Sequence, residues 1–277
     1  MIKRLYPGGK DKAFNITYDD GVLQDVRFVQ LMNKYNLKGT FNLNSQLMKE
    51  EFEWIHESGL SIKRLSPQKV VELYQGHEIA SHTLTHPYIE GLGEEEITRQ
   101  MTEDKRNLEQ LFGREVTGFA VPFSYYSPLV AWCALKCGFE YARCSQERYT
   151  YIPPENYYWW AAGAYHINPE WREFANDFFS TDVELALCQI VGHSYDLDTE
   201  NMWNEMEQLL KKVSIADDIS PMTNIELVRY LKAIRSVNTN GKIINNTTDT
   251  DLWFSINGKT VCVKAGEKLN IQKYSRQ

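Results

Sequence analysis

Apolar and polar residues alternate near the start of the chain in the pattern of a buried β-strand. Phe14, Ile16 and Tyr18 alternate with two polar residues, which is the two-residue period of a strand. Two aspartates and a glycine follow directly at residues 19–21, and this combination is a turn signal that ends a strand. The pattern therefore predicts a strand that delivers two carboxylates at its carboxyl end.

Asp19 and Asp20 reach one site only if the backbone turns there. Neighbouring side chains of a strand point to opposite faces of the sheet, and Gly21 permits the turn that would bring both carboxylates together. A simple strand-ending turn is the ordinary interpretation of Asp-Asp-Gly, so this stretch needs support from elsewhere in the chain.

The periodicity of the following segments predicts strands that alternate with helices. Further strands are predicted at residues 37–44, 79–82, 116–123, 139–144, 158–165 and 185–193. Helices are predicted at residues 22–35, 66–74, 94–111 and 127–136. Such alternation is typical of a parallel sheet with right-handed crossovers. About seven strands, with the candidate chemistry at their carboxyl ends, favour a closed or nearly closed α/β barrel over an open doubly wound sheet.

The residue pattern changes after Ser236 from long helical segments to short strand-like runs. A turn-rich link at residues 238–241 is followed by short strand-like runs, with Asn257-Gly258 as a hairpin signal between two of them. We therefore predict two parts, a barrel over residues 1–237 and a small all-β appendage over residues 238–277. So few residues bury little core alone, which favours a packing lid or edge extension over a carbohydrate-binding module.

Composition limits the classes of partner. The 277 residues are 43% hydrophobic and carry a formal net charge of −7, which argues against nucleic acid because its binding normally rests on a basic patch. No apolar run approaches the roughly 18 residues of a membrane span, and the first nine residues lack the apolar stretch of a secretory signal. As given, the chain is expected in the cytoplasm and away from membranes, and export with a trimmed leader stays open.

Three histidines at the ends of apolar runs give the aspartate pair the support it needs. His82 and His86 are four residues apart, the spacing that places two imidazoles on one face of a helical turn and lets them share a metal ion. His193 ends the run at residues 185–193. The carboxyl ends of parallel strands meet on one rim of an α/β barrel, so these side chains are candidates for a single site.

Four short motifs carry a resemblance to a known family. Residues 17–21 (TYDDG), 82–87 (HTLTHP), 120–123 (AVPF) and 191–193 (VGH) resemble, in order and spacing, the motifs of NodB-like polysaccharide deacetylases, over about residues 13–200. The resemblance implies an irregular (β/α)7-type barrel, one strand short of the eightfold form. It also implies a metal-dependent hydrolase that removes acetyl groups from an N- or O-acetylated carbohydrate.

Together, the residue chemistry and the resemblance assign a role to each candidate residue. Asp20, His82 and His86 are expected to hold one divalent metal ion, with zinc as the default for such ligands. Asp19 is expected to be the base that takes a proton from a metal-activated water. The resemblance implies that His193 is the acid for the leaving group and that the backbone N–H of Phe123 is an oxyanion donor.

The third motif departs from the family pattern. The family usually carries an arginine two residues before the motif's proline, where this chain has Ala120. Such a cation would orient the catalytic aspartate and hold its pKa down. Arg143, expected at the end of the next strand on the same rim, is a candidate to supply this charge from a neighbouring position. The alternative is an ordinary surface arginine.

Three other functions remain open at this point. Two histidines and a carboxylate also form the facial triad of non-haem iron oxygenases, although Asp19 and His193 would have no evident task there. The departure at Ala120 supports a non-catalytic barrel that binds a metal or a carbohydrate. The same metal chemistry would also allow hydrolysis of a small-molecule amide.

Overall fold

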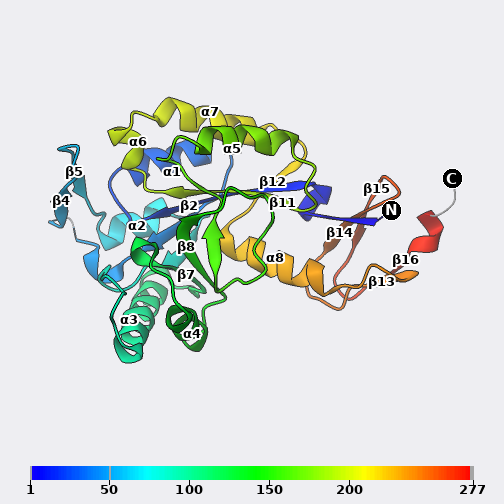
Figure 1. The fold of residues 1–277 in the computed structure, drawn as a ribbon, viewed down its shortest axis with the longest axis horizontal. Helices are drawn as coiled ribbons and strands as arrows, with labels where there is room; N and C mark the ends of the chain where they lie inside the picture. The colour runs from blue at the N-terminus through cyan, green and yellow to red at the C-terminus, as the bar shows by residue number, and fades with distance from the viewer. Residues whose placement is uncertain (1, 50, 275–277) are drawn as a thin grey trace.

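A curled parallel sheet forms the centre of the protein, whose computed structural model describes residues 2–49 and 51–274 (Figure 1). All of its paired strands run parallel, in the order β10-β11-β2-β3-β6-β7-β8-β9. The bounds of these strands are β2 (Lys12–Asp19), β3 (Thr40–Leu43), β6 (Glu78–Ser81), β7 (Gly118–Ala120), β8 (Tyr141–Glu147), β9 (Trp160–Ala162), β10 (Ala164–Tyr165) and β11 (Ala186–Gly192).

One interrupted strand brings the two edges of the sheet together. Its first half, β9, pairs with β8, and its second half, β10, pairs with β11. Gly163 lies between the halves, where a Cβ atom would come within 2.5 Å of the Gln189 carbonyl oxygen. The barrel therefore has seven strand positions and is nearly closed, which confirms the predicted fold class. β12 (Ile219–Pro221) pairs only with the start of β2.

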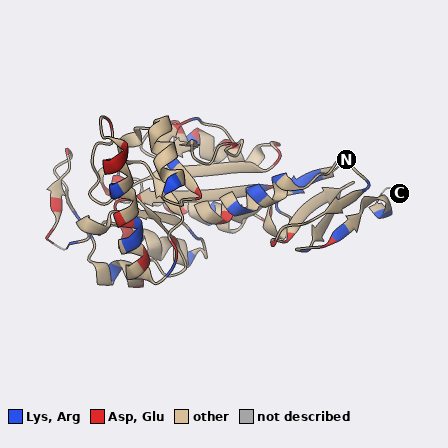
Figure 2. Cartoon of the chain, turned by 90° about the horizontal axis from the view of Figure 1, so that it is seen from below, with Lys and Arg blue, Asp and Glu red and all other residues tan. Residues whose placement is uncertain are grey.

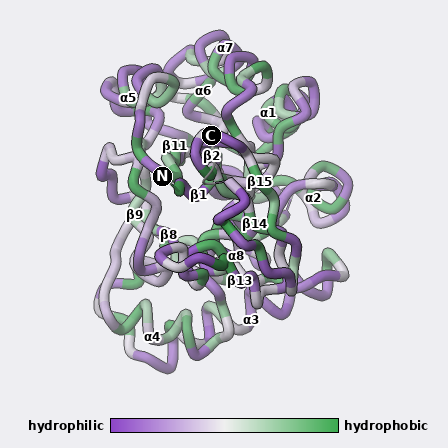
Figure 3. The backbone as a smooth tube through the Cα atoms, turned by 90° about the vertical axis from the view of Figure 1, so that its right-hand side faces the viewer, coloured by the Kyte–Doolittle hydropathy of each residue, from purple (hydrophilic) through white to green (hydrophobic). Residues whose placement is uncertain are grey.

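Helices cover the outside of the barrel (Figure 1). The four predicted helices are present, and four more, α5 to α8, follow in the second half of the chain. Their bounds are α1 (Asp25–Lys34), α2 (Pro67–Leu73), α3 (Glu94–Phe112), α4 (Pro128–Lys136), α5 (Trp171–Asp177), α6 (Asp196–Thr199), α7 (Trp203–Ser214) and α8 (Asn224–Ser236). Acidic and basic side chains are interleaved along these helices (Figure 2), and hydrophilic and hydrophobic residues alternate along them (Figure 3), as expected of helices with one buried face.

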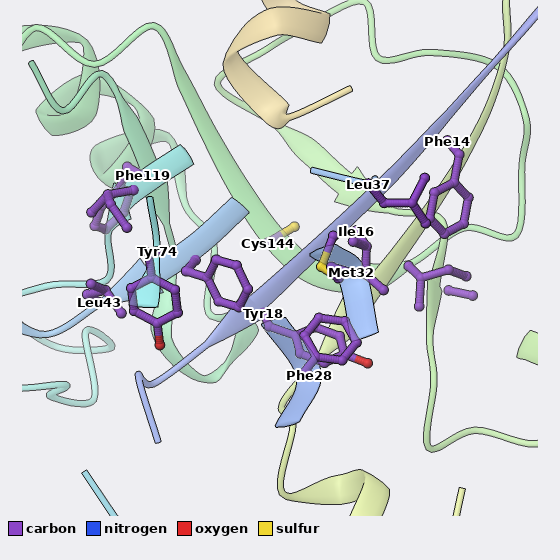
Figure 4. Packing of buried hydrophobic residues seen from close by; sticks show 14 of the residues in the cluster. Phe14, Ile16, Tyr18, Phe28, Met32, Leu37, Leu43, Tyr74, Phe119 and Cys144 are labelled. Atoms are coloured by element: carbon purple, nitrogen blue, oxygen red, sulfur yellow. The ribbon is translucent and has the colours of Figure 1, made fainter. Parts of the chain in front are cut away.

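The alternating residues of β2 divide between the inside and the outside of the barrel. Phe14, Ile16 and Tyr18 pack outward among the apolar residues under the helices (Figure 4), and the Tyr18 ring stacks on Phe28 of α1 with 4.2 Å between centroids. The polar residues face inward, where Asn15 accepts a hydrogen bond from Gln189 of β11. Because Asp19 continues the polar series, its carboxylate also enters the barrel.

The β appendage lies at the end of the barrel where β2 begins, away from the carboxyl ends of the strands (Figure 1). One of its sheets contains β1 (Ile2–Leu5), β14 (Leu252–Ile256) and β15 (Lys259–Val263), and the other pairs β13 (Ile243–Asn245) with β16 (Lys268–Asn270). Its apolar residues form one buried cluster with those of α8. The first strand of the chain therefore joins this sheet, a contribution that the predicted segment 238–277 did not include.

A second small element lies at the site end of the barrel. The strands β4 (Glu53–Ile55) and β5 (Ser61–Lys63) form an antiparallel hairpin between β3 and α2. The periodicity of the sequence did not predict this hairpin. Among the helices of the described residues, none combines the length and the apolar character required to cross a bilayer.

Candidate metal and catalytic site

The predicted site residues gather around one pocket at the carboxyl ends of the strands. The pocket has a volume of about 380 Å³, near the lower limit for small-molecule sites. Its lining comes from the ends of β2, β6, β7, β8, β10 and β11 and from the loops after them, and consists of Asp19, Asp20, His82, His86, Val121, Phe123, Ser124, Ser145, Tyr165, Gly192, His193 and Tyr195.

Asp19 is held inside the barrel by a cation and an amide. Arg143 donates to Asp19 Oδ1, and Asn42 Nδ2 donates to the same oxygen at 2.7 Å. Burial opposes ionisation of Asp19, but the charges of Arg143 and the nearby histidines outweigh it and hold the pKa below its usual value. The other oxygen, Oδ2, lies 3.9 Å from His82 Nε2. Asp19 is therefore a carboxylate at neutral pH.

Arg143 occupies the position that the sequence suggested, although not at a strand end. It lies within β8, in register with Ala120 of β7, and its side chain is completely buried. It is therefore not a surface arginine. The guanidinium that the third motif lacks at Ala120 enters the barrel from the adjacent strand.

The turn after β2 places Asp20 beside Asp19. Asp20 and Gly21 both have left-handed backbones, with φ of 87° and 65°, and the Asp20 N–H donates to the Asn42 carbonyl oxygen at 2.9 Å. Arg64, which directly follows the β4–β5 hairpin, has Nη2 2.9 Å from Asp20 Oδ1. Burial opposes ionisation of Asp20, yet Arg64 and the nearby histidines hold its pKa far below the usual value.

His82 and His86 complete a group that fits a metal ion. The ligand atoms of Asp20, His82 and His86 all lie within 4.8 Å of one another. His82 Nδ1 lies 2.9 Å from the Ala120 carbonyl oxygen, which accepts the Nδ1 proton and leaves Nε2 as the free donor atom. Burial lowers the pKa of both rings, that of His86 to about 4. Both imidazoles are therefore neutral at pH 7.

Two further observations describe how this group is built. Asp20 Oδ1 is buried and accepts no well-directed hydrogen bond from any residue that the structure describes, although Arg64 Nη2 lies 2.9 Å away. The carboxylate oxygen therefore keeps a lone pair for a cation. The histidines do not share a helical turn, because the chain after β6 is a loop in which Thr83 and His86 have φ of 69° and 52°. The expected helical spacing was wrong, but the two rings still lie only 4.8 Å apart between centroids.

His193 faces the same carboxylates from the end of β11. Its Nε2 lies 3.8 Å from Asp20 Oδ2, and its Nδ1 lies 3.1 Å from Asp196 Oδ2. Burial works against protonation of His193, but Asp196 outweighs it and, together with Asp20 and Asp19, raises the pKa to about 9. His193 is therefore the one imidazole at the pocket that is protonated at pH 7.

A chain of hydrogen bonds supports His193 from inside the protein. Asp196 Oδ2 also lies 3.2 Å from His166 Nε2, and His166 Nδ1 lies 2.6 Å from the Tyr18 hydroxyl. The Tyr165 hydroxyl contacts His193 Nδ1 at 2.8 Å. These contacts fix the ring of His193 with Nε2 toward the pocket.

Phe123 lies at the rim with a strained backbone. Phe123 and Ser124 have φ of 52° and 58°, a left-handed conformation that is uncommon outside glycine and that is often found at functional sites. The Phe123 ring stacks on Tyr88 at 3.9 Å and contacts His86 at 4.5 Å between centroids. The Phe123 side chain therefore lies beside His86 at the rim of the pocket.

Sequence reasoning missed three side chains of this site. Asp196 is three residues after His193. This spacing is visible in the sequence, but the prediction considered only strand ends and histidines. His166 was assigned to no motif, and Arg64 follows a hairpin that was not predicted. Only the tertiary fold brings the last two to the pocket.

Comparison with known proteins identifies the family. Residues 7–142 match the family model described as polysaccharide deacetylase. Over these residues, about half of its length, the chain belongs to the polysaccharide deacetylase family. The match contains Asp19, Asp20, His82, His86 and Phe123. It ends one residue before Arg143 and does not reach His193.

Solved structures share the fold of this chain at low identity. A protein from Mycobacterium smegmatis, named as a suspected polysaccharide deacetylase, is 14% identical, with a TM-score of 0.61 over 84% of this chain and 94% of that chain. Puue allantoinase is 12% identical, with a TM-score of 0.61 over 81% and 91%. A CE4 family pseudoenzyme from Bacillus anthracis is 16% identical, with a TM-score of 0.50 over 82% and 68%. A comparison with curated proteins gave no significant match.

Membership of the polysaccharide deacetylase family supports deacetylation of an acetylated carbohydrate. The structures with this fold include an allantoinase and a pseudoenzyme by name, so the fold alone does not define the reaction. The metal, the catalytic residues and the exact substrate must be argued from the pocket itself.

Proposed function

We propose that this protein is a metal-dependent hydrolase that removes acetyl groups from an N- or O-acetylated carbohydrate. One observation carries the proposal. A group that fits a metal ion, an ionised carboxylate and a protonated imidazole face the same pocket. Metal-dependent hydrolysis of an acetyl group uses these three functions together.

Asp20, His82 and His86 would hold one divalent ion, with zinc as the expected metal for one carboxylate and two neutral imidazoles. Asp20 Oδ1, which pairs with Arg64 but accepts no well-directed hydrogen bond from the described residues, and the free Nε2 of His82 support this assignment. When bound, such an ion would supply Lewis acidity that lowers the pKa of a water molecule and polarises the acetyl oxygen.

Asp19 is proposed as the general base that removes a proton from the attacking water. Its Oδ1 is occupied by Arg143 and Asn42, so Oδ2 is the atom available to accept the proton. Arg143 stabilises the carboxylate form and fixes its orientation, which is the task that the family gives to an arginine at the position of Ala120. This contact also counts against a non-catalytic barrel.

His193 is proposed as the acid that protonates the departing amine or alcohol from Nε2. Asp196 contacts Nδ1 on the opposite side of the ring, so it both orients the imidazolium and keeps it protonated. The backbone N–H of Phe123 would donate to the oxyanion that forms as the carbonyl carbon becomes tetrahedral.

Hydrolysis of a small-molecule amide is the second candidate. The pocket volume of about 380 Å³ lies near the lower limit for small-molecule sites, which favours a small substrate. The non-haem iron oxygenase becomes the weakest alternative, because the base and the acid on either side of the metal group have no role in that chemistry.

The test combines metal analysis with acetate release. Purified protein with bound zinc should release acetate from acetylated chitin oligomers, peptidoglycan fragments or acetylxylan. His82→Ala and His86→Ala should lose most of the metal, whereas His77→Gln, at a buried histidine far from the pocket, should retain it. Full metal content in both alanine variants would exclude the assigned ligands. Full metal content without acetate release from any substrate would favour the non-catalytic barrel.

A further inference from the structure

Arg64 connects the β4–β5 hairpin to the candidate metal ligand Asp20. Its Nη2 lies 2.9 Å from Asp20 Oδ1, and its Nη1 donates to the backbone carbonyl of the same residue. Nη1 also donates to Asn44 Oδ1 at 3.1 Å. The Arg64 side chain is 95% buried, so solvent screens its charge very little.

The position of this cation is unusual for a metal site. Groups behind a metal ligand are usually carboxylates or carbonyls, which make the ligand more basic and strengthen metal binding. A guanidinium does the opposite, because it withdraws negative charge from the carboxylate and repels a divalent ion. The proposed base, Asp19, has its own arginine in Arg143, so Arg64 is not needed to stabilise that carboxylate.

The atom that Arg64 contacts is the one that faces the metal group. Asp20 Oδ1 lies 3.9 Å from His86 Nε2 and accepts no hydrogen bond from the described residues. A cation bound between Asp20 and His86 would therefore lie next to the guanidinium. The two positive charges compete for one carboxylate oxygen.

We infer that Arg64 is a positioning residue that sets the affinity of the metal site by competing with the ion for Asp20. The inference rests on the proposed metal site. Its consequence is an ion held by a less basic carboxylate, which exchanges more readily and is a stronger Lewis acid than the same three ligands would hold without the arginine.

A purely structural role for Arg64 would have a different consequence. The Arg64 N–H donates to the Phe52 carbonyl at 3.1 Å, and the guanidinium carbon lies 5.2 Å from the Trp54 ring centroid, so the residue also fastens the hairpin. If this fastening alone mattered, a variant without the guanidinium would have a less ordered Asp20. It would then bind metal more weakly.

The experiment measures zinc affinity directly, by competition with a chromogenic chelator after removal of metal from the purified protein. Arg64→Gln should tighten zinc binding by roughly tenfold or more, whereas Arg64→Lys, which retains a charge, should stay closer to wild type. Lys63→Gln is the matched control, because it removes an exposed positive charge from the same hairpin. It should leave the affinity unchanged.

Weaker or unchanged zinc binding in a folded Arg64→Gln protein would overturn the inference and leave only the structural role. If this variant does not fold, Arg64→Met supplies a neutral, apolar side chain of similar length at the same position. A wild-type protein that binds no zinc would instead refute the proposed metal site, and circular dichroism of each metal-free variant separates both results from unfolding.

Discussion

Two sets of buried aspartates in this protein are stabilised in opposite ways. Asp19 and Asp20 at the pocket each contact an arginine, and their pKa values are lowered. Asp25 and Asp104, which are buried residues of α1 and α3, accept hydrogen bonds from hydroxyl and backbone N–H groups. Burial raises their pKa values, to about 6 and about 7.

The difference separates carboxylates that must stay charged from those that need only hydrogen-bond donors. A base or a metal ligand acts as the anion, which requires a nearby cation once water is excluded. Asp104 needs no charge to accept from the Ser45 N–H and the Ser81 hydroxyl, both at 2.6 Å. A lowered pKa beside a pocket is thus a better indicator of function here than burial alone.

Matched Asp→Asn variants test this comparison most strongly through turnover. Asp19→Asn should retain zinc and lose turnover by roughly 10²–10⁴-fold, because it removes a base and not a ligand. Asp104→Asn should keep turnover near the wild-type value. Steady-state acetate release and metal analysis of both proteins check this. Normal turnover in Asp19→Asn would place the base elsewhere.

Removal of Arg143 should give Asp19 the raised pKa of a buried aspartate that has no cation beside it. In Arg143→Ala, burial of Asp19 is no longer opposed by the guanidinium, so its pKa should rise and turnover at neutral pH should fall by about 10–100-fold. The loss should diminish as the pH increases, and Arg143→Lys should recover it only in part. The pH profile of kcat/KM with metal content measures the effect, and an unchanged acid limb would refute the role of Arg143.

Local patterns predicted much of the fold because they report on it directly. The alternation in β2 and the Asp-Asp-Gly turn correctly indicated a strand with two carboxylates at its end. Repeated strand and helix patterns then favoured a barrel. The helices α5 to α8 and the β4–β5 hairpin were missed, although Gly59 lies in the turn of the hairpin with a φ of 85°.

The electrostatic partners of the site were harder to predict because they depend on tertiary distance. Arg143 was suggested only through the absence of an arginine at Ala120, and its place within a strand rather than at an end came from the structure. Arg64 is 44 residues from Asp20, and no spacing rule connects them. His166 reaches Asp196 only because β10 lies beside β11.

The imidazole at the pocket extends the comparison to a group that must stay protonated. The pKa of His193 is raised to about 9, so an acid role predicts full activity below that pH and a loss as the pH rises through it. Asp196→Asn removes the main cause of the raised pKa and should move the alkaline limb to lower pH by about one unit or more. Tyr165→Phe keeps the carboxylate and should move it less. An alkaline limb that is the same in Asp196→Asn and wild type would contradict this role.

The smallest expected effect concerns stability, and here the two sets of aspartates should differ in sign. The pKa of Asp104 is raised from 3.8 to about 7 in the folded protein. Between these values the folded state binds more protons than the unfolded chain, so the free energy of unfolding falls as the pH rises. Asparagine cannot ionise, and its amide can accept from the Ser45 N–H and donate to the Ser81 hydroxyl.

Relative to wild type, the free energy of unfolding of Asp104→Asn should therefore increase by roughly 1–3 kcal/mol between pH 5 and pH 8. The lowered pKa of Asp19 has the opposite consequence. Its ion pair stabilises the fold above the ordinary aspartate pKa, and this contribution is lost only as the pH falls through the lower folded value, so Asp19→Asn should be less stable than wild type throughout the same range. Chemical denaturation of the three metal-free proteins at several pH values measures both differences. Parallel pH dependence of the two variants would show that the arginine contact does not distinguish the two sets.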